Sequence, residues 1–206
     1  MKLRRRALSA LLPLALALPA AADTWNVDKA HSVVGFEIRH LVGKVQGRFG
    51  EFSGTVTGDP AKPESSTVAF TIKTASISTN EEKRDAHLKS PDFFDAEKNP
   101  EIAFRSTSIK PGAAGHYLVT GPLTMHGVTK DVTLDVTLAG PMKDPWGNQR
   151  AGLEATTTIN RKDWGIVWNK VLDAGSAMLG DDVKIAIELE VTRKTEVPAE
   201  KLSVKK

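Results

Sequence analysis

The chain has 206 residues, with 28 Lys and Arg against 25 Asp and Glu, and no cysteine. The lack of cysteine excludes a disulfide framework, a thiolate nucleophile, a Cys-ligated metal and covalent haem attachment. The length suits one good-sized domain, which must therefore be held together by its hydrophobic core.

The first 22 residues have the pattern of a secretory signal peptide. Four bases, Lys2, Arg4, Arg5 and Arg6, precede a short apolar run, and small residues at an A-x-A spacing end at Ala22. The run is shorter than the roughly 20 residues that a membrane-spanning helix needs. We therefore expect cleavage after Ala22, no stable membrane anchor, and export to the periplasm of a bacterial cell. An uncleaved N-terminal anchor is the alternative.

Cleavage would also change the charge. Residues 1–22 hold four of the bases and none of the acids, so 24 bases and 25 acids remain, a net charge of −1. The positive charge of the full chain therefore does not indicate nucleic-acid binding.

Most of the remaining chain alternates apolar and polar residues with a period of two, which is typical of half-buried strands. In chain order the pattern appears in SVVGFEIRH, GEFSGTVTG, TVAFTIK, EIAFRSTSI, HYLVTGPLTM, DVTLDVTLAG, AGLEATTTI and VKIAIELEV, and His126-Gly127 is an expected turn. About eight strands joined by short loops predict an antiparallel barrel or a sandwich. Residues 23–192 form the predicted domain, and the polar residues 193–206 are predicted to be disordered.

One helix is predicted, within EEKRDAHLKSPDFFD, residues 81–95. Thr79 or Asn80 is the expected N-cap, because Glu82 follows Thr79 by three positions as in a capping box. The residue before Pro91 is expected to end the helix, since proline disfavours the helical conformation of its predecessor.

The same stretch offers the best candidates for a catalytic or metal site: Asp85, His87, Asp92 and Asp95. Residues two apart do not share a helix face, and no second histidine follows His87 four positions later. His31, His40, His116 and His126 lie on predicted strands or turns, where a structural role is expected, although the fold could bring three histidines together. Without a nucleophile elbow or a phosphate-binding loop, no catalytic residue, metal or cofactor is predicted.

A closed barrel of about eight strands is just wide enough to hold a slender ligand. Lys83, Arg84 and Lys89 on the helix are predicted either to face water or to meet an anionic head group. A filled core without a cavity is the alternative for the interior residues. The alternation predicts that these strand residues line the cavity: Val34, Phe36, Ile38, Phe70, Ile72, Phe104, Leu134 and Val136. The expected apolar underside of the helical flap adds Leu88, Phe93 and Phe94.

A set of segments in a fixed order makes the chain resemble the YceI-like family of polyisoprenoid-binding, lipocalin-like periplasmic proteins. The resemblance covers about Thr24 to Glu190. The chain departs from the family pattern in AGSAMLGDD, where Ala177 and Met178 stand in place of more aliphatic residues. The segments are WNVDKAHSVVGFEIRHL, VQGRFGEFSGTV, ASISTNEEKRDAHLKSPDFFDAEKNPEIAFRSTSI, LTMHGVTKDVTL, TINRKDWGIVWN and GDDVKIAIELE.

The resemblance implies an all-β, lipocalin-like antiparallel β-barrel with a short helical flap. Its cavity would hold the tail of a long-chain isoprenoid, such as an isoprenoid quinone or a prenyl phosphate, or of another amphiphilic lipid, without catalysis. No nucleic-acid partner is expected, and a homodimer is left open. Two alternatives remain: a periplasmic enzyme acting on an isoprenoid or quinone, and a stress-related interaction protein without a lipid.

Overall fold

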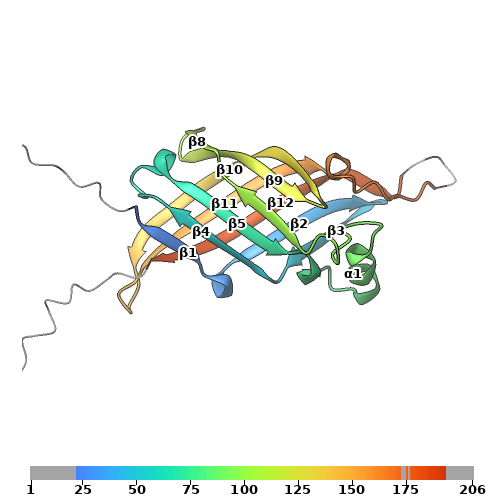
Figure 1. Ribbon diagram of the computed structural model, residues 1–206, viewed down its shortest axis with the longest axis horizontal. Coiled ribbons are helices and arrows are strands. Elements are labelled where there is room, and N and C mark those ends of the chain that lie inside the picture. The colour runs from blue at the N-terminus through green and yellow to red at the C-terminus, as the bar shows by residue number, and fades with distance from the viewer. Residues whose placement is uncertain (1–21, 173–174, 176, 194–206) are drawn as a thin grey trace, which may run out of the picture.

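The computed structural model describes residues 22–172, 175 and 177–193. These residues form a closed antiparallel β-barrel with one α-helix (Figure 1), which confirms the predicted all-β barrel. Within these residues the barrel has eight strand positions but twelve strands, because some positions are occupied by two short strands in succession. The expected leader and the polar tail lie outside the described residues, apart from Ala22 and Arg193. The strands are β1 (Thr24–Val27), β2 (Val33–His40), β3 (Gly43–Phe49), β4 (Phe52–Thr57), β5 (Thr67–Lys73), β6 (Ile77–Ser78), β7 (Glu101–Arg105), β8 (Ser108–Pro111), β9 (His116–Met125), β10 (Val128–Lys143), β11 (Gln149–Asn160) and β12 (Leu179–Arg193).

The barrel closes because two short strands follow one another along the same edge of β12. β12 pairs with β2 between Leu179 and Glu188, and with β1 at Val191 and Thr192. β1 pairs on its other side with β4, and the ladder continues through β5, β7, β9, β10 and β11 back to β12. The 3-10 helices that interrupt the strands are η1 (Lys29–His31), η2 (Pro63–Ser65), η3 (Thr74–Ser76) and η4 (Arg161–Trp164).

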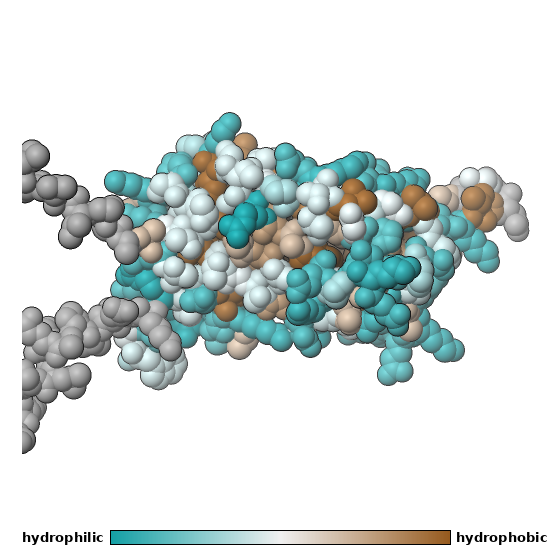
Figure 2. All heavy atoms as spheres, viewed as in Figure 1, coloured by the Kyte–Doolittle hydropathy of each residue, from teal (hydrophilic) through white to brown (hydrophobic). Residues whose placement is uncertain are grey.

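The alternation of the sequence decides which side chains point inward. In β12, Ile185, Ile187 and Leu189 line the interior, while Lys184 and Glu188 are exposed outside. Successive side chains of a strand point to opposite faces, and the long pairing of β11 with β12 fixes the register. The outer face in Figure 2 is accordingly mostly hydrophilic, with apolar residues in small separate spots.

The α-helix α1 (Glu82–Lys89) begins differently from the prediction. Its N-cap is Glu81, whose carboxylate accepts hydrogen bonds from the backbone N–H groups two and three positions later, at 3.1 and 2.7 Å. The predicted caps, Thr79 and Asn80, lie before the helix and do not cap it, because a carboxylate at position 81 is closer to the free N–H groups. The helix ends before Ser90, as the following proline predicts.

The two ends of the barrel differ, as Figure 1 shows. The flap end carries α1, the β2–β3 turn and η4, and the hairpin end carries the β10–β11 turn, the start of β1 and the end of β12. A buried cluster that includes Phe49, Phe93, Trp164 and Ile166 fills the flap end. Within the described residues no helix is both long and apolar enough to span a membrane.

Candidate functional site

The barrel contains an apolar cavity of about 410 Å³, within the usual size range of small-molecule pockets. Side chains from most strands of the barrel line it. That these residues bind a ligand stays a prediction, but the structure places all of the predicted apolar residues on its wall: Val34, Phe36, Ile38, Phe70, Ile72, Leu88, Phe93, Phe94, Phe104, Leu134 and Val136.

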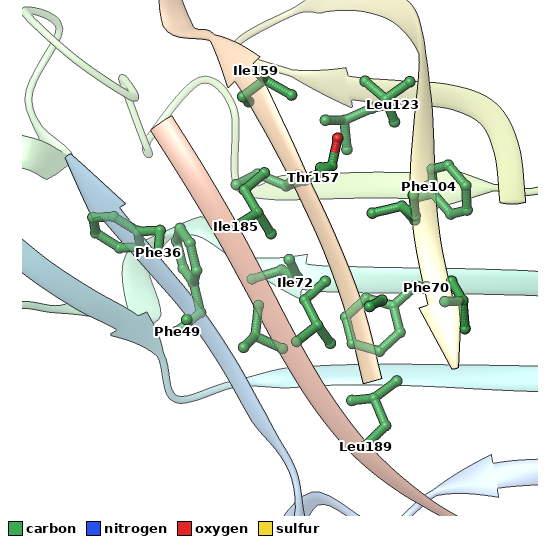
Figure 3. Close-up of a pocket in the computed structure, with 18 of the residues that line it drawn as sticks. Phe36, Phe49, Phe70, Ile72, Phe104, Leu123, Thr157, Ile159, Ile185 and Leu189 are labelled. Atoms are coloured by element: carbon green, nitrogen blue, oxygen red, sulfur yellow. The ribbon is translucent and has the colours of Figure 1, made fainter. Parts of the chain in front are cut away.

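The middle of the cavity is a hydrocarbon surface. In Figure 3, Phe36, Ile72 and Leu189 project from separate strands, and Thr157 carries a hydroxyl among them. This hydroxyl donates a hydrogen bond to the carbonyl oxygen of Thr133 at 2.9 Å. Because it is already paired, this part of the wall favours a ligand held by apolar contact.

Two glycines keep aromatic rings flat against the wall. The ring of Phe36 lies across Gly47 on the neighbouring strand, where a Cβ would approach Phe36 Cζ to 2.3 Å. The ring of Phe70 lies across Gly54 in the same way, with a Cβ at 2.4 Å from Phe70 Cδ2. Side chains at these two positions would push the rings inward, so glycine here preserves the width of the cavity.

The flap closes one end of the cavity. Leu88 and the turn after α1 supply the apolar underside, with Phe93 only 7 % exposed. The ring of His87 stands edge-on to Phe93 and to Trp168, with centroids 5.0 and 4.9 Å apart. These contacts join the flap to the segment that follows η4.

A buried arginine holds that segment in place. Arg161 is 3 % exposed, and its Nη1 donates to the carbonyl oxygens of Ile166 and Trp168 at 2.8 Å each. Its Nε donates to the carbonyl oxygen of Gly180 at 2.9 Å. Burial lowers the pKa of Arg161, and the Asp181 carboxylate opposes this. Although Arg161 lines the cavity, its donors are directed to the backbone.

The cavity opens at the hairpin end. Residues 138–141 of β10 line the cavity and are also exposed to solvent, with Leu138 at 38 % exposure. Pro60 and Pro63, from the loop between β4 and β5, line the same cavity. Tyr117 lies close to this opening, since it pairs with Val136, and it brings a hydroxyl to the wall. We call this opening, between residues 138–141 and the β4–β5 loop, the mouth.

The three bases predicted to meet a head group lie on the flap, at the closed end. Lys83 and Lys89 are not among the residues that line the cavity, whereas Arg84 is. The Arg84 guanidinium donates from Nε to Thr79 Oγ1 at 2.7 Å and from Nη2 to the Thr79 carbonyl oxygen at 2.9 Å. It therefore braces the start of α1, and its contact with a head group remains a prediction.

In the predicted alternative site His87 and Asp92 come together, whereas Asp85 bonds to Thr79 and Asp95 to Lys98. His87 pairs with Asp92 (Nε2 to Oδ2, 2.8 Å) and His116 pairs with Asp135 (Nδ1 to Oδ1, 2.6 Å), at different places on the barrel. His126 Nδ1 lies 2.8 Å from the carbonyl oxygen of Trp164. Each of these rings has its own partner, as expected of structural histidines.

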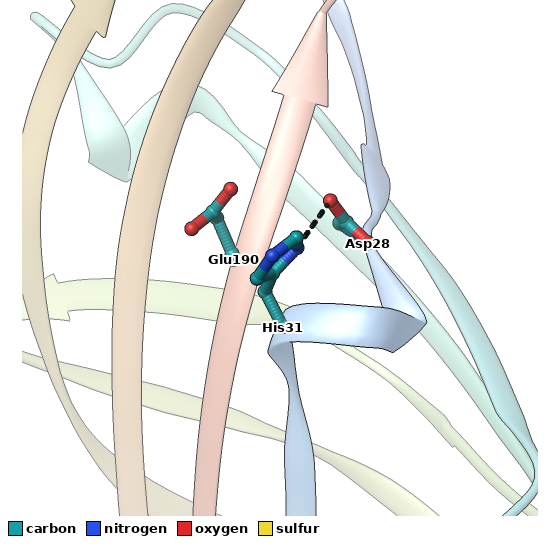
Figure 4. Close-up of side chains that lie close together, drawn as sticks. All are labelled: Asp28, His31 and Glu190. Carbon is teal, nitrogen blue, oxygen red and sulfur yellow. Dashed lines mark hydrogen bonds and ion pairs between the residues drawn. The ribbon is translucent and has the colours of Figure 1, made fainter. Parts of the chain in front are cut away.

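Within the described residues, one group has the composition and spacing of metal ligands: Asp28, His31 and Glu190 (Figure 4). Arg150 also belongs to it, because its Nη1 donates to Asp28 Oδ2 at 2.9 Å and to Glu190. Hydrogen bonds from His31 and Arg150 hold the pKa of Asp28 below its usual value. A guanidinium between the carboxylates supplies the positive charge that a cation would otherwise bring, so the group is an ion-pair network.

A family model described as a YceI-like domain matches residues 25–191. The chain belongs to the YceI-like family. The UPF0312 protein of Pseudomonas putida GB-1 is 47 % identical over 150 residues, covering 71 % of this chain and 78 % of that protein. Among solved structures, Burkholderia cenocepacia BcnA is 28 % identical with a TM-score of 0.71, covering 80 % of this chain and 98 % of its own.

A more distant structure has the same fold. A domain from Saccharophagus degradans, described as polyisoprenoid-binding and implicated in plant cell wall breakdown, has a TM-score of 0.62 at 14 % identity. The match covers 82 % of this chain and 98 % of that domain. The barrel of the YceI-like family is thus retained while most of the sequence changes.

The sequence prediction missed a substantial part of the YceI-like cavity. The alternation of VKIAIELEV correctly places Ile185, Ile187 and Leu189 on one face, and these residues could have been included in the predicted wall. Trp25 also lines the cavity, although its strand is too short to show a period. The mouth was not predicted, because exposure of residues 138–141 depends on where neighbouring strands end.

Proposed function

We propose that this YceI-like protein is an exported carrier that holds the tail of a long-chain isoprenoid, or of a similar amphiphilic lipid, inside its barrel without covalent chemistry. The observation that carries the proposal is the hydrocarbon-lined cavity, closed by the flap and open at the mouth. The polyisoprenoid-binding description of the Saccharophagus degradans domain supports the same ligand class.

The energetics suit reversible loading. Burial of each CH₂ group is worth about 0.8 kcal/mol relative to water, so a prenyl chain of several units gains strongly from entering the cavity. The prenyl chain is also favourably solvated in a membrane, and ordering it inside the cavity costs conformational entropy. Because these terms oppose the gain, transfer in either direction is feasible, as a carrier requires.

The mouth is the place for the head group. A tail that enters first would leave the polar end of the lipid between residues 138–141 and the β4–β5 loop, near the hydroxyl of Tyr117. A quinone oxygen and a prenyl phosphate oxygen can both accept a hydrogen bond from a phenol. At the flap end, the Arg84 guanidinium already donates two hydrogen bonds to Thr79, which leaves fewer donors for a head group.

The proposed location is the periplasm. Its support is the sequence of residues 1–22, with its basic start, short apolar run and A-x-A end. Mass measurement of the exported protein tests this part, because the proposal requires Asp23 as the first residue.

Native mass spectrometry of the exported protein, followed by organic extraction, tests the carrier function. The expected result is a stoichiometric prenyl lipid or quinone. Val136→Trp should lose this lipid and stay folded, since the indole fills the cavity; Asp131→Trp, on the exposed side of the same strand, is the matched control and should keep it. A protein free of lipid that takes up no added prenyl chain would contradict the proposal, and unfolding of Val136→Trp would indicate a filled core.

A further inference from the structure

We propose that the protein docks on anionic lipid bilayers through the β10–β11 turn, with Trp146 and Met142 inserted in the interface and the mouth facing the membrane. Docking would serve the proposed carrier function, on which the biological purpose of this inference rests. Docking itself needs no ligand in the cavity, so each can be tested separately.

The turn presents large apolar side chains to solvent. Trp146 is 79 % exposed and Met142 is 68 % exposed, and Leu138 further down the same hairpin is 38 % exposed. Isolated exposed apolar residues are common, but several on one projecting hairpin form a patch that indicates an interaction site. Tryptophan in particular favours the interface between membrane and water, because its ring is apolar and its N–H is polar.

The turn is firmly built, so the exposure of Trp146 is a fixed feature. The Asp144 carboxylate, with a side-chain exposure of 4 %, accepts from the backbone N–H groups of Trp146 and Asn148 at 3.0 and 2.8 Å. It also accepts from Asn148 Nδ2 at 3.0 Å and from Arg150 Nε at 2.9 Å. Arg150 is in turn paired with Asp28 on the barrel wall. The network holds the turn outward, which lowers the ordering cost of insertion.

An apolar path joins the turn to the cavity. Residues 138–141, which are exposed and line the cavity, are followed directly by Met142 on the same strand. A bilayer in contact with Met142 and Trp146 would therefore meet the mouth. A prenyl tail could pass along this path with little exposure to water, which its apolar surface opposes.

Charge at this end selects an anionic bilayer. Lys143 lies between Met142 and the turn, whereas the Asp144 carboxylate is only 4 % exposed and is ion-paired with Arg150, which Asp28 and Glu190 share. The chain leaves the barrel beside the same turn, since Gln149 pairs with Arg193. Residues 194–206 that follow carry four Lys against two Glu. Basic residues next to an apolar insertion site attract anionic phospholipid.

The flap end offers a competing apolar surface. Val42 is 107 % exposed and Val171 is 70 % exposed. We favour the hairpin end because residues that line the cavity are exposed to solvent there, while those that line it at the flap end are buried or half-buried. Val42 and Val171 thus provide a control pair of exposed apolar residues at the opposite end.

Vesicle flotation of the exported protein, with Asp23 verified as its first residue, tests the docking. Vesicles of phosphatidylcholine with about one third phosphatidylglycerol are compared with pure phosphatidylcholine. The expected result is binding to the anionic vesicles, an approximately tenfold loss for the double variant Met142→Ser with Trp146→Ser, and unchanged binding for Val42→Ser with Val171→Ser. All variants change exposed side chains, and their melting curves confirm folding.

Three outcomes would overturn the docking: no vesicle binding by the wild type, equal binding by the Met142/Trp146 variant, or loss of binding only in the Val42/Val171 variant. Uptake of a prenyl alcohol from detergent solution is measured on the same proteins. The Met142/Trp146 variant should retain this uptake, because its cavity wall is intact. Vesicle binding by a wild-type protein that takes up no prenyl chain would sink the carrier function and leave the docking standing.

Discussion

Arg150 donates from Nε to Asp144 Oδ2 at 2.9 Å and thereby ties the β10–β11 turn to the barrel. Burial raises the pKa of the Asp144 carboxyl, but hydrogen bonds from Arg150, Asn148 and the backbone outweigh it and lower the pKa from 3.8 to about 2. The same guanidinium also binds Asp28 and Glu190, which are far away in the sequence. One side chain therefore couples the exposed turn to β12 and to the segment after β1.

The depressed pKa of Asp144 predicts a stability change in acid. Because the folded carboxyl has the lower pKa, the folded state binds fewer protons than the unfolded state between about pH 2 and 4. The contribution of Asp144 is thus present above pH 4 and is lost as the pH falls toward 2. Asp144→Asn should lower the free energy of unfolding at neutral pH. It should also flatten the rise of this free energy between pH 2 and 4, as measured by urea unfolding across that range. Parallel pH curves for the two proteins would show that Asp144 contributes nothing.

Arg161 should be the most sensitive charged residue of the flap end. Arg161→Lys keeps the charge but cannot reach the carbonyl oxygens of Ile166, Trp168 and Gly180 together. Leaving buried acceptors unpaired costs about 1–3 kcal/mol each, so we expect a loss of about 3 kcal/mol in the free energy of unfolding. The nearby Lys162→Arg, on an exposed residue, is the control. A loss below about 0.5 kcal/mol in the free energy of unfolding for Arg161→Lys would contradict this prediction, because ordinary surface sites show losses of that size.

Gly47 is predicted to set the width of the cavity. In Gly47→Ala the new methyl group would lie 2.3 Å from Phe36 Cζ, so the ring must move away from the wall and into the cavity. We expect weaker prenyl binding, together with a stability loss of about 1 kcal/mol from overpacking. Gly43→Ala is the control, because its nearest neighbour, the His40 carbonyl oxygen, would be 3.9 Å away. Equal binding by both variants would contradict this role.

The barrel was predicted well from the sequence because the alternation of apolar and polar residues is a local signal that recurs in strand after strand. Alternation in DVTLDVTLAG and VKIAIELEV identifies both the strands and the face that points inward. Strand pairing was less accessible: β1 and β2 share one edge of β12, which no local pattern reveals. The N-cap at Glu81 was not predicted because several neighbouring polar residues are also suited to the N-cap position.

The apolar wall of the cavity was predicted in part and its two ends incompletely, and ligand binding by these residues stays a prediction. Phe93 and Phe94 were assigned to the flap from their position after a helix, and both line the cavity. The network around Arg150 joins residues more than a hundred positions apart, and the mouth joins residues 138–141 to the β4–β5 loop. Both depend on the closure of the barrel. Side chains such as Lys83 carry no local sign of which end of the barrel they will occupy.

The position of the head group gives the last prediction. If the polar end of the lipid lies at the mouth, Tyr117→Phe should weaken binding of a prenyl ligand with an oxygen-bearing head group about fivefold, the value of one hydrogen bond. It should leave binding of a headless prenyl hydrocarbon unchanged, because the ring still lines the wall. Lys83→Ala and Lys89→Ala, at the flap end and outside the cavity lining, should affect neither ligand. Fluorescence competition measures the affinities of the wild type and the three variants for both ligands, and a loss confined to the two lysine variants would place the head group under the flap instead.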